Sequence, residues 1–132
     1  QYSDEIAYIR RVLSDESEAG DAFFDAVVRQ TQDIIHAGIE AGTIRKFDDA
    51  RSTAVVIASN SLSILMLGRH LSRTLGTVAP EPQGIGPDLL RQLTLPALEI
   101  YTHGFYTDSR FLDAARDALQ HDSTSAGREH AL

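Results

Sequence analysis

Residues 48–75 constrain the fold most, because they have the pattern of one long helix that is apolar on nearly every side. Uncharged polar residues interrupt this segment in its middle, at Ser59, Asn60, Ser61 and Ser63. A surface helix carries its apolar residues on one stripe, whereas a helix that is apolar nearly all round must be covered on several sides. Neighbouring helices of a short chain cover one or two faces, and a second copy of the molecule is the natural cover for another. The segment therefore predicts a homodimer, with room for an internal cavity beside the polar block.

Composition excludes several classes of protein. With 132 residues, the chain is long enough for one domain that folds without disulfide bonds or a structural metal ion. It has no cysteine, so neither disulfides nor a thiolate metal site can form. The polar block and the flanking charges interrupt the apolar segment, so we expect no membrane span and a cytoplasmic protein. The first residue, Gln1, suggests a fragment or a processed product.

The charge balance argues against direct binding of nucleic acid. Nineteen acidic residues against twelve basic ones give a net charge of −7, which phosphate backbones repel. The local basic pairs, Arg10 with Arg11 and Arg69 with Arg73, are expected to lie on solvated helix faces. If the protein acts on DNA, the part that contacts DNA is expected to lie outside this chain.

The periodicity of the apolar residues predicts an all-α protein, an antiparallel bundle of about five helices. Ser17, Asp48 or Asp49, and Asp108 are suited to cap helix starts, and Pro87 suits a first turn. Gly42 is suited to end a helix in the left-handed conformation. The predicted helices span residues 4–13, 17–42, 48–75, 87–106 and about 109–120. Residues 1–120 would form the domain, and residues 121–132, which are polar and without periodicity, a flexible tail.

No pattern of an enzyme is present. The first three histidines, His36, His70 and His103, do not fall at the helical spacing of a metal site, and the serines lack the Gly-x-Ser-x-Gly turn of a nucleophile. No glycine-rich loop follows a strand, as a phosphate-binding loop would. We therefore expect no catalytic residue, no metal ligand and no cofactor.

The polar block is the best candidate for a specific site. Buried hydroxyls and amides need hydrogen-bond partners, so the serines either bond to their own helix, with Asn60 tied to a neighbouring helix, or they face a ligand. In the second interpretation Asn60 and Ser63, on one face with Val56 and Leu67, line a largely apolar pocket between helices. Each apolar wall residue of this pocket could instead belong to the ordinary core. The candidate ligand-binding residues are Tyr8, Phe24, Val27, Val28, Asn60, Ser63, Leu67 and Tyr101.

A second face is a candidate for dimerisation. Leu90, Leu93, Ala97 and Gly104 lie along one side of the helix predicted over 87–106, and small residues there allow another helix to approach closely. This face either packs within the subunit or forms half of a two-fold, four-helix interface with the outer face of residues 48–75. We favour the interface, because the apolar surface exceeds what one small subunit covers. The candidate interface residues are Ile64, Leu71, Leu90, Leu93, Ala97 and Gly104.

Three motifs carry a resemblance to a known family. They are IEAGTIR at residues 39–45, FDDAR at 47–51 at the start of the long apolar helix, and LPALEIYTHGF at 95–105. Together they resemble the C-terminal regulatory domain of the TetR (tetracycline-repressor) family. The resemblance covers residues 2–120.

The resemblance implies an all-helical, homodimeric, ligand-binding domain of a bacterial transcriptional repressor. In that family an N-terminal helix-turn-helix domain binds a palindromic operator, and a small apolar or amphipathic effector in the regulatory domain releases it. The chain has no such N-terminal helices, so we expect it to begin partway into the regulatory domain and to reach operator DNA only through a missing domain. The alternative is a helical dimerisation or protein-interaction module without a small-molecule site.

Overall fold

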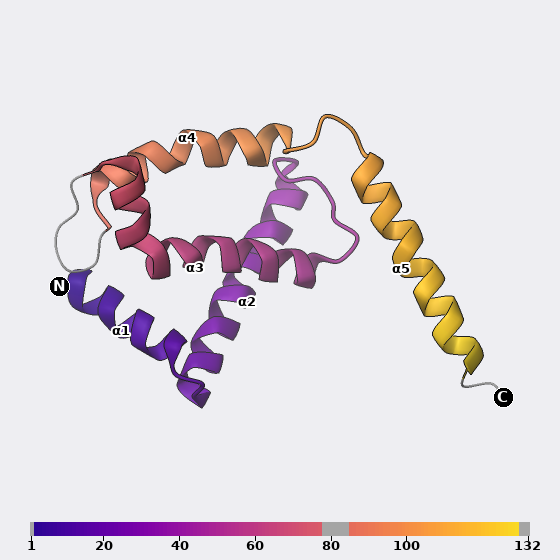
Figure 1. The fold of residues 1–132 in the computed structure, drawn as a ribbon, viewed down its shortest axis with the longest axis horizontal. Helices are drawn as coiled ribbons and strands as arrows, with labels where there is room; N and C mark the ends of the chain where they lie inside the picture. Colours follow the sequence, from indigo (N-terminus) through magenta and orange to yellow (C-terminus); the bar gives the residue numbers. More distant parts are fainter. Residues whose placement is uncertain (1, 78–84, 130–132) are drawn as a thin grey trace. The chain divides into compact units, whose positions relative to one another are not determined.

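The computed structural model describes residues 2–77 and 85–129, which form five helices and contain no strand (Figure 1). This confirms the all-α prediction. The helices are α1 (Tyr2–Ser14), α2 (Glu18–Ala41), α3 (Ala50–Leu75), α4 (Pro87–His103) and α5 (Arg110–Glu129).

Polar side chains cap the starts of α2 and α3, as their sequence predicts. The Ser17 hydroxyl accepts a hydrogen bond from the backbone N–H of Gly20 at 3.3 Å. Of the two aspartates suited to cap α3, Asp49 is the one that does so, and its carboxylate accepts from the backbone N–H of Ser52 at 3.0 Å. Each cap satisfies a backbone donor that has no partner inside its own helix.

Glycines in the left-handed conformation follow three of the helices. Gly42 (φ 75°) and Gly76 (φ 65°) end α2 and α3, where the backbone turns to a φ that other residues rarely adopt. Gly104 (φ 80°) does the same after His103. Helix α4 is therefore shorter than the predicted helix, which continued to Tyr106.

The hydrophobic core lies between α2 and α3. Val28 and Ile35 of α2 are buried against Ala54 and Ala58 of α3, both of which are buried as well. Alanine methyl groups let the two helix backbones approach closely, and the larger side chains of α2 fill the space around them. Half-buried residues surround this cluster: Phe24, Val27, Ile39, Ile44, Phe47 and Ile57.

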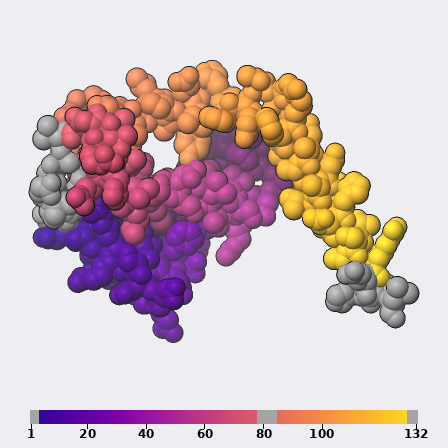
Figure 2. Space-filling model, in the orientation of Figure 1, coloured from indigo at the N-terminus to yellow at the C-terminus, as the bar shows by residue number. Residues whose placement is uncertain are grey.

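Helix α1 packs on both α2 and α3, and Figure 2 shows its surface against α2. A glycine makes the approach to α2 possible. A Cβ atom at Gly20 would lie 2.5 Å from the carbonyl oxygen of Val12 and 3.0 Å from that of Asp15. Any side chain there would overlap the backbone at the end of α1, so Gly20 permits the tight turn between the two helices.

The chain divides into two compact units between Gln92 and Leu93. The first contains α1, α2, α3 and the start of α4, where Leu89 is fully buried. The second contains the rest of α4 and α5, and its described side chains from Thr94 to Arg128 are exposed.

Helix α5 continues to Glu129, beyond the predicted end of the last helix near residue 120. Its hydroxyl side chains bond to its own backbone: Ser123 donates to the carbonyl of Leu119 at 3.0 Å, and Thr124 to that of Gln120 at 2.9 Å. A helix needs only local hydrogen bonds, whereas the prediction relied on apolar periodicity. Residues 130–132 lie outside the described part of the chain.

Helix α3 is long and apolar enough to cross a membrane by length and composition, with a mean hydropathy of 1.3 over its most apolar window. The sequence argument that its polar block and charges rule out such a segment was therefore too strict. One such helix is weak evidence for a membrane, because core helices of soluble proteins pass the same test. Here Ala54 and Ala58 place one side of α3 in the core.

The Gly20 contact makes a prediction about stability. We expect Gly20→Ala to lower the free energy of unfolding by about 1–3 kcal/mol, because the new methyl group overlaps backbone atoms that cannot easily move. The matched control is Gly127→Ala in α5, where a Cβ meets no atom within 4 Å. There alanine should stabilise by roughly 0.5–1 kcal/mol, since glycine is unfavourable inside a helix. Urea denaturation followed by circular dichroism measures both, and equal midpoints for Gly20→Ala and the wild type would contradict the tight contact.

The cap of α3 predicts a pH dependence. Hydrogen bonds from the Ser52 hydroxyl and backbone N–H lower the pKa of Asp49. The cap therefore contributes stability above the pKa of an unfolded aspartate, about 3.9, and loses it as the pH falls through the lower folded value.

We expect Asp49→Asn to keep the cap but to remove this titration, because asparagine also accepts at a helix start. The variant should lose less stability than the wild type when urea unfolding is repeated through the acid range. Asp33→Asn, on an exposed part of α2, is the control and should follow the wild type. If Asp49→Asn also follows the wild type, the Asp49 carboxylate does not cap α3 in solution.

Candidate functional site

The serines in the middle of α3 bond to their own helix. This agrees with the first of the two interpretations as far as the hydroxyls are concerned. The amide of Asn60 has no hydrogen-bond partner among the described residues, so no bond to a neighbouring helix holds it. The three hydroxyls donate to backbone carbonyls, Ser59 to Val55 at 2.7 Å, Ser61 to Ile57 at 3.0 Å and Ser63 to Asn60 at 2.6 Å.

The structure brings Val56, Asn60, Ser63 and Leu67 onto one side of α3, which we call the outer face. All four are exposed, Val56 by 59% and Leu67 by 47%. At 100° per residue this side is turned away from the alanines that pack on α2. The outer face thus has the composition of a ligand-binding wall, apolar with one amide and one hydroxyl, and it is open in the single protomer.

Three of the candidate ligand-binding residues lie in the α2–α3 core. Val28 is 5% exposed, and Phe24 and Val27 are half-buried against the same cluster. They pack towards the alanine side of α3 and not towards the outer face. The structure therefore does not bring them together with Asn60 and Ser63 in this protomer.

The two candidate tyrosines lie in different units. Tyr8 of α1 is exposed and lines an open hollow of about 430 Å³ with Asp4, Glu5, Ile9 and Phe23. Tyr101 belongs to the second unit and is also exposed.

The candidate interface residues differ in burial. Ile64, Leu71 and Leu93 are half-buried, whereas Leu90 and Ala97 are exposed and Gly104 follows the end of α4. Further large apolar side chains of α4, which the sequence analysis did not select, are exposed: Leu95 by 75%, Leu98 by 56% and Ile100 by 51%. Leu95 and Leu98 lie away from the side of α4 that carries Leu90, Leu93 and Ala97, so a single apolar stripe does not include them, whereas Ile100 lies on the same side as Leu93.

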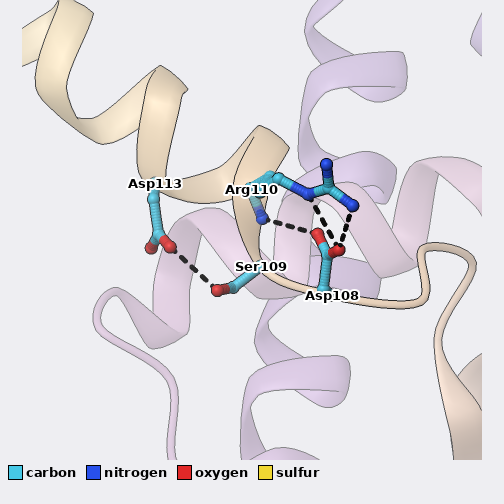
Figure 3. A network of polar contacts seen from close by, with 4 residues as sticks. All are labelled: Asp108, Ser109, Arg110 and Asp113. Carbon is cyan, nitrogen blue, oxygen red and sulfur yellow. Dashed lines mark hydrogen bonds and ion pairs between the residues drawn. The ribbon is translucent and has the colours of Figure 1, made fainter.

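The second unit contains a hollow of about 470 Å³ at the start of α5, lined by Tyr106, Thr107, Asp108, Arg110, Phe111 and Ala114. The Asp108 carboxylate accepts from the backbone N–H of Arg110 at 3.0 Å and pairs with the guanidinium at 2.8 Å (Figure 3). Helix α5 begins at Arg110, so Asp108 reaches its first residue from one position before the residue that directly precedes the helix. The hydrogen bond from the Arg110 guanidinium to the Asp108 carboxylate lowers the pKa of Asp108 and raises the pKa of Arg110. Ser109 donates to Asp113 one turn later at 2.8 Å. These contacts fix the start of a helix, and both charges are already paired with each other.

The observed position of Arg10 contradicts one prediction from the sequence. It was predicted to lie on a solvated face with Arg11, but it is half-buried and its Nε donates to the backbone carbonyl of Leu65 in α3. The signal that could have revealed it is its place on α1, on the same side as the apolar residues Ile6, Ile9 and Leu13. Arg11 is exposed, as predicted.

The described residues contain no group of three or more histidine, aspartate or glutamate side chains that could hold a metal ion. The outer face of α3 and the exposed apolar side chains of α4 are surfaces suited to non-covalent binding.

The comparisons agree with the motifs of the sequence. Curated proteins and solved structures give no match to the chain. The family described as tetracyclin repressor-like, C-terminal domain, matches residues 1–107. The match contains α1 to α4 and leaves α5 outside it. Since it covers most of the chain, this protein belongs to the tetracycline-repressor-like C-terminal domain family.

Proposed function

We propose that the chain is the effector-sensing and dimerisation domain of a TetR-like transcriptional repressor of the bacterial cytoplasm. The observation that carries the proposal is the uncovered apolar surface of a family member. Large apolar side chains on α3 and α4 are about half exposed or more, among them Val56, Leu90, Leu95 and Leu98. Exposed apolar surface of this extent marks a binding site for another molecule.

A second copy of the chain would cover part of this surface. In the proposed four-helix interface, α3 and α4 of each protomer pack on the same helices of the partner about a two-fold axis. The α3 residues Ile64 and Leu71 and the α4 residues Leu90, Leu93 and Ala97, with Gly104 at the end of α4, would form it.

The effector would be a small apolar or amphipathic molecule bound at the outer face of α3. Val56 and Leu67 offer apolar contact, and the Asn60 amide, which has no partner among the described residues, offers hydrogen bonds to the polar end of a ligand. Tyr8 and Tyr101 remain candidate ligand-binding residues on the strength of the sequence alone. Phe24, Val27 and Val28 would support the site from the core behind α3.

The proposed mechanism is a population shift. The dimer would set the separation of two DNA-reading domains, which must match operator half-sites about 34 Å apart. An effector that prefers another separation weakens operator binding by its differential affinity, typically 1–3 kcal/mol. The net charge of −7 supports DNA contact through a separate domain and not through this one.

The alternative function is a protein-interaction module that dimerises or docks a partner without binding a small molecule. The hydrogen bonds of the serine hydroxyls to their own helix favour it, because these groups then need no ligand.

The dimer is tested by a charge at the proposed interface. Leu90→Glu places a carboxylate where two apolar surfaces meet, and we expect it to weaken the dimer on the order of 100-fold or more, since an unpaired buried charge costs about 3–5 kcal/mol. Sedimentation velocity over a series of concentrations measures the effect. Leu119→Glu is the control, because it adds the same charge to an exposed site in α5, outside the family match, and should leave the dimer intact. A wild-type chain that stays monomeric throughout the micromolar range would contradict the proposal.

The effector site is tested by filling it. A thermal-shift screen of small apolar and amphipathic compounds should give compounds that raise the Tm of the wild-type chain. Ser63→Phe, which places a ring on the outer face, should abolish the shift or weaken binding at least about tenfold, because the ring occupies the space of the ligand. Ser125→Phe on α5 is the matched control. Compounds that bind Ser63→Phe as tightly as the wild type would place the site elsewhere, and a screen without any stabilising compound would favour the interaction module.

A further inference from the structure

Arg10 occupies an unusual place on α1. Ile6, Ile9 and Leu13, which share its side of the helix, are half-buried in the same way as Arg10, whereas the neighbouring Arg11 is exposed. A guanidinium on the apolar side of a helix must keep hydrogen bonds to offset its lost contact with water. The contacts of Arg10 are therefore part of how α1 docks.

The guanidinium reaches the middle of α3. Its Nε donates to the backbone carbonyl of Leu65, 55 positions along the chain. Inside an α-helix that carbonyl normally accepts only from the N–H four residues later, that of Arg69. A side chain from another helix that bonds to such a carbonyl is one of the known causes of a helix bend.

Helix α3 does change direction along its length, between the half that crosses α2 and the half that leads to Gly76 (Figure 1). The serine block lies directly before Leu65, and serine hydroxyls that bond back to carbonyls of their own helix favour bending. The back-bonded hydroxyls of the serine block and the guanidinium of Arg10 from α1 thus both act on α3 at this level.

We propose that Arg10 is a positioning residue that couples the outer face of α3 to α1. When the bend of α3 changes, the Leu65 carbonyl moves, and α1 must follow it or lose the hydrogen bond. A ligand on the outer face, beside Ser63, would thereby change the placement of α1. That α1 passes the change on towards a DNA-reading domain rests on the proposed function, whereas the link between α3 and α1 does not.

The test is a double-variant cycle read by hydrogen exchange of the intact chain, followed by mass spectrometry. Replacing Ser59, Ser61 and Ser63 together by alanine removes the back-bonds of exposed residues, and we expect it to straighten α3. With Arg10 present, we expect the amides of α1 to exchange several-fold faster in this triple variant than in the wild type. With Arg10→Met, the same triple replacement should change the exchange of α1 by less than about twofold, because the link is already cut.

Arg11→Met is the matched control and should retain the full response. If Arg10→Met does not fold, Arg10→Gln replaces it, since glutamine stays polar but is too short to span to α3, and it should also lose the response. The proposal is overturned if the serine replacements leave α1 unchanged in the presence of Arg10, or if α1 responds equally without Arg10. Either result leaves the dimer and the effector site untouched, because they are tested by sedimentation and thermal shift.

Discussion

The close contact of α2 with α3 is the interaction on which the rest of the first unit depends. Ala54 and Ala58 present only methyl groups to Val28 and Ile35, so the helices lie close and the core is thin. A thin core of this kind covers one side of α3 and leaves the other side to water or to another molecule. The exposure of the outer face therefore follows directly from the way the core is built.

This arrangement gives α3 two roles at once. Its inner side is fixed by packing, and its outer side carries the amide, hydroxyl and apolar groups of Asn60, Ser63 and Leu67. Packed interiors do not deform continuously, so a ligand that moves one side of such a helix changes how the other side packs. The bond from Arg10 adds a third contact at the same level of the helix. A single helix that joins core, surface and α1 agrees with the proposed effector-sensing role.

The sequence predicted best what depends on local chemistry. Ser17, Asp49 and Gly42 end or begin their helices as expected, because capping needs only a few neighbouring atoms. It predicted less well what depends on tertiary placement: Arg10 was expected in solvent but bonds to α3, because the two arginines were judged as a charged pair and not by their position relative to Ile6, Ile9 and Leu13. Whether Phe24 belongs to a pocket or to the core could not be decided from spacing either, because both environments select the same apolar side chains. In α5, periodicity gave the end of the helix too early, because the helix continues past residue 120 through polar and small residues that have no apolar face to bury.

The short connection between α2 and α3 has a consequence for how the chain acquires its structure. The core cluster runs from Val28 to Ala58, so all its members come from two consecutive helices. Contacts of small sequence separation close quickly, because little loop entropy is lost in bringing them together. During synthesis on the ribosome this hairpin of two helices can form before α4 and α5 have emerged, so that the first unit has a folded nucleus before the chain is complete.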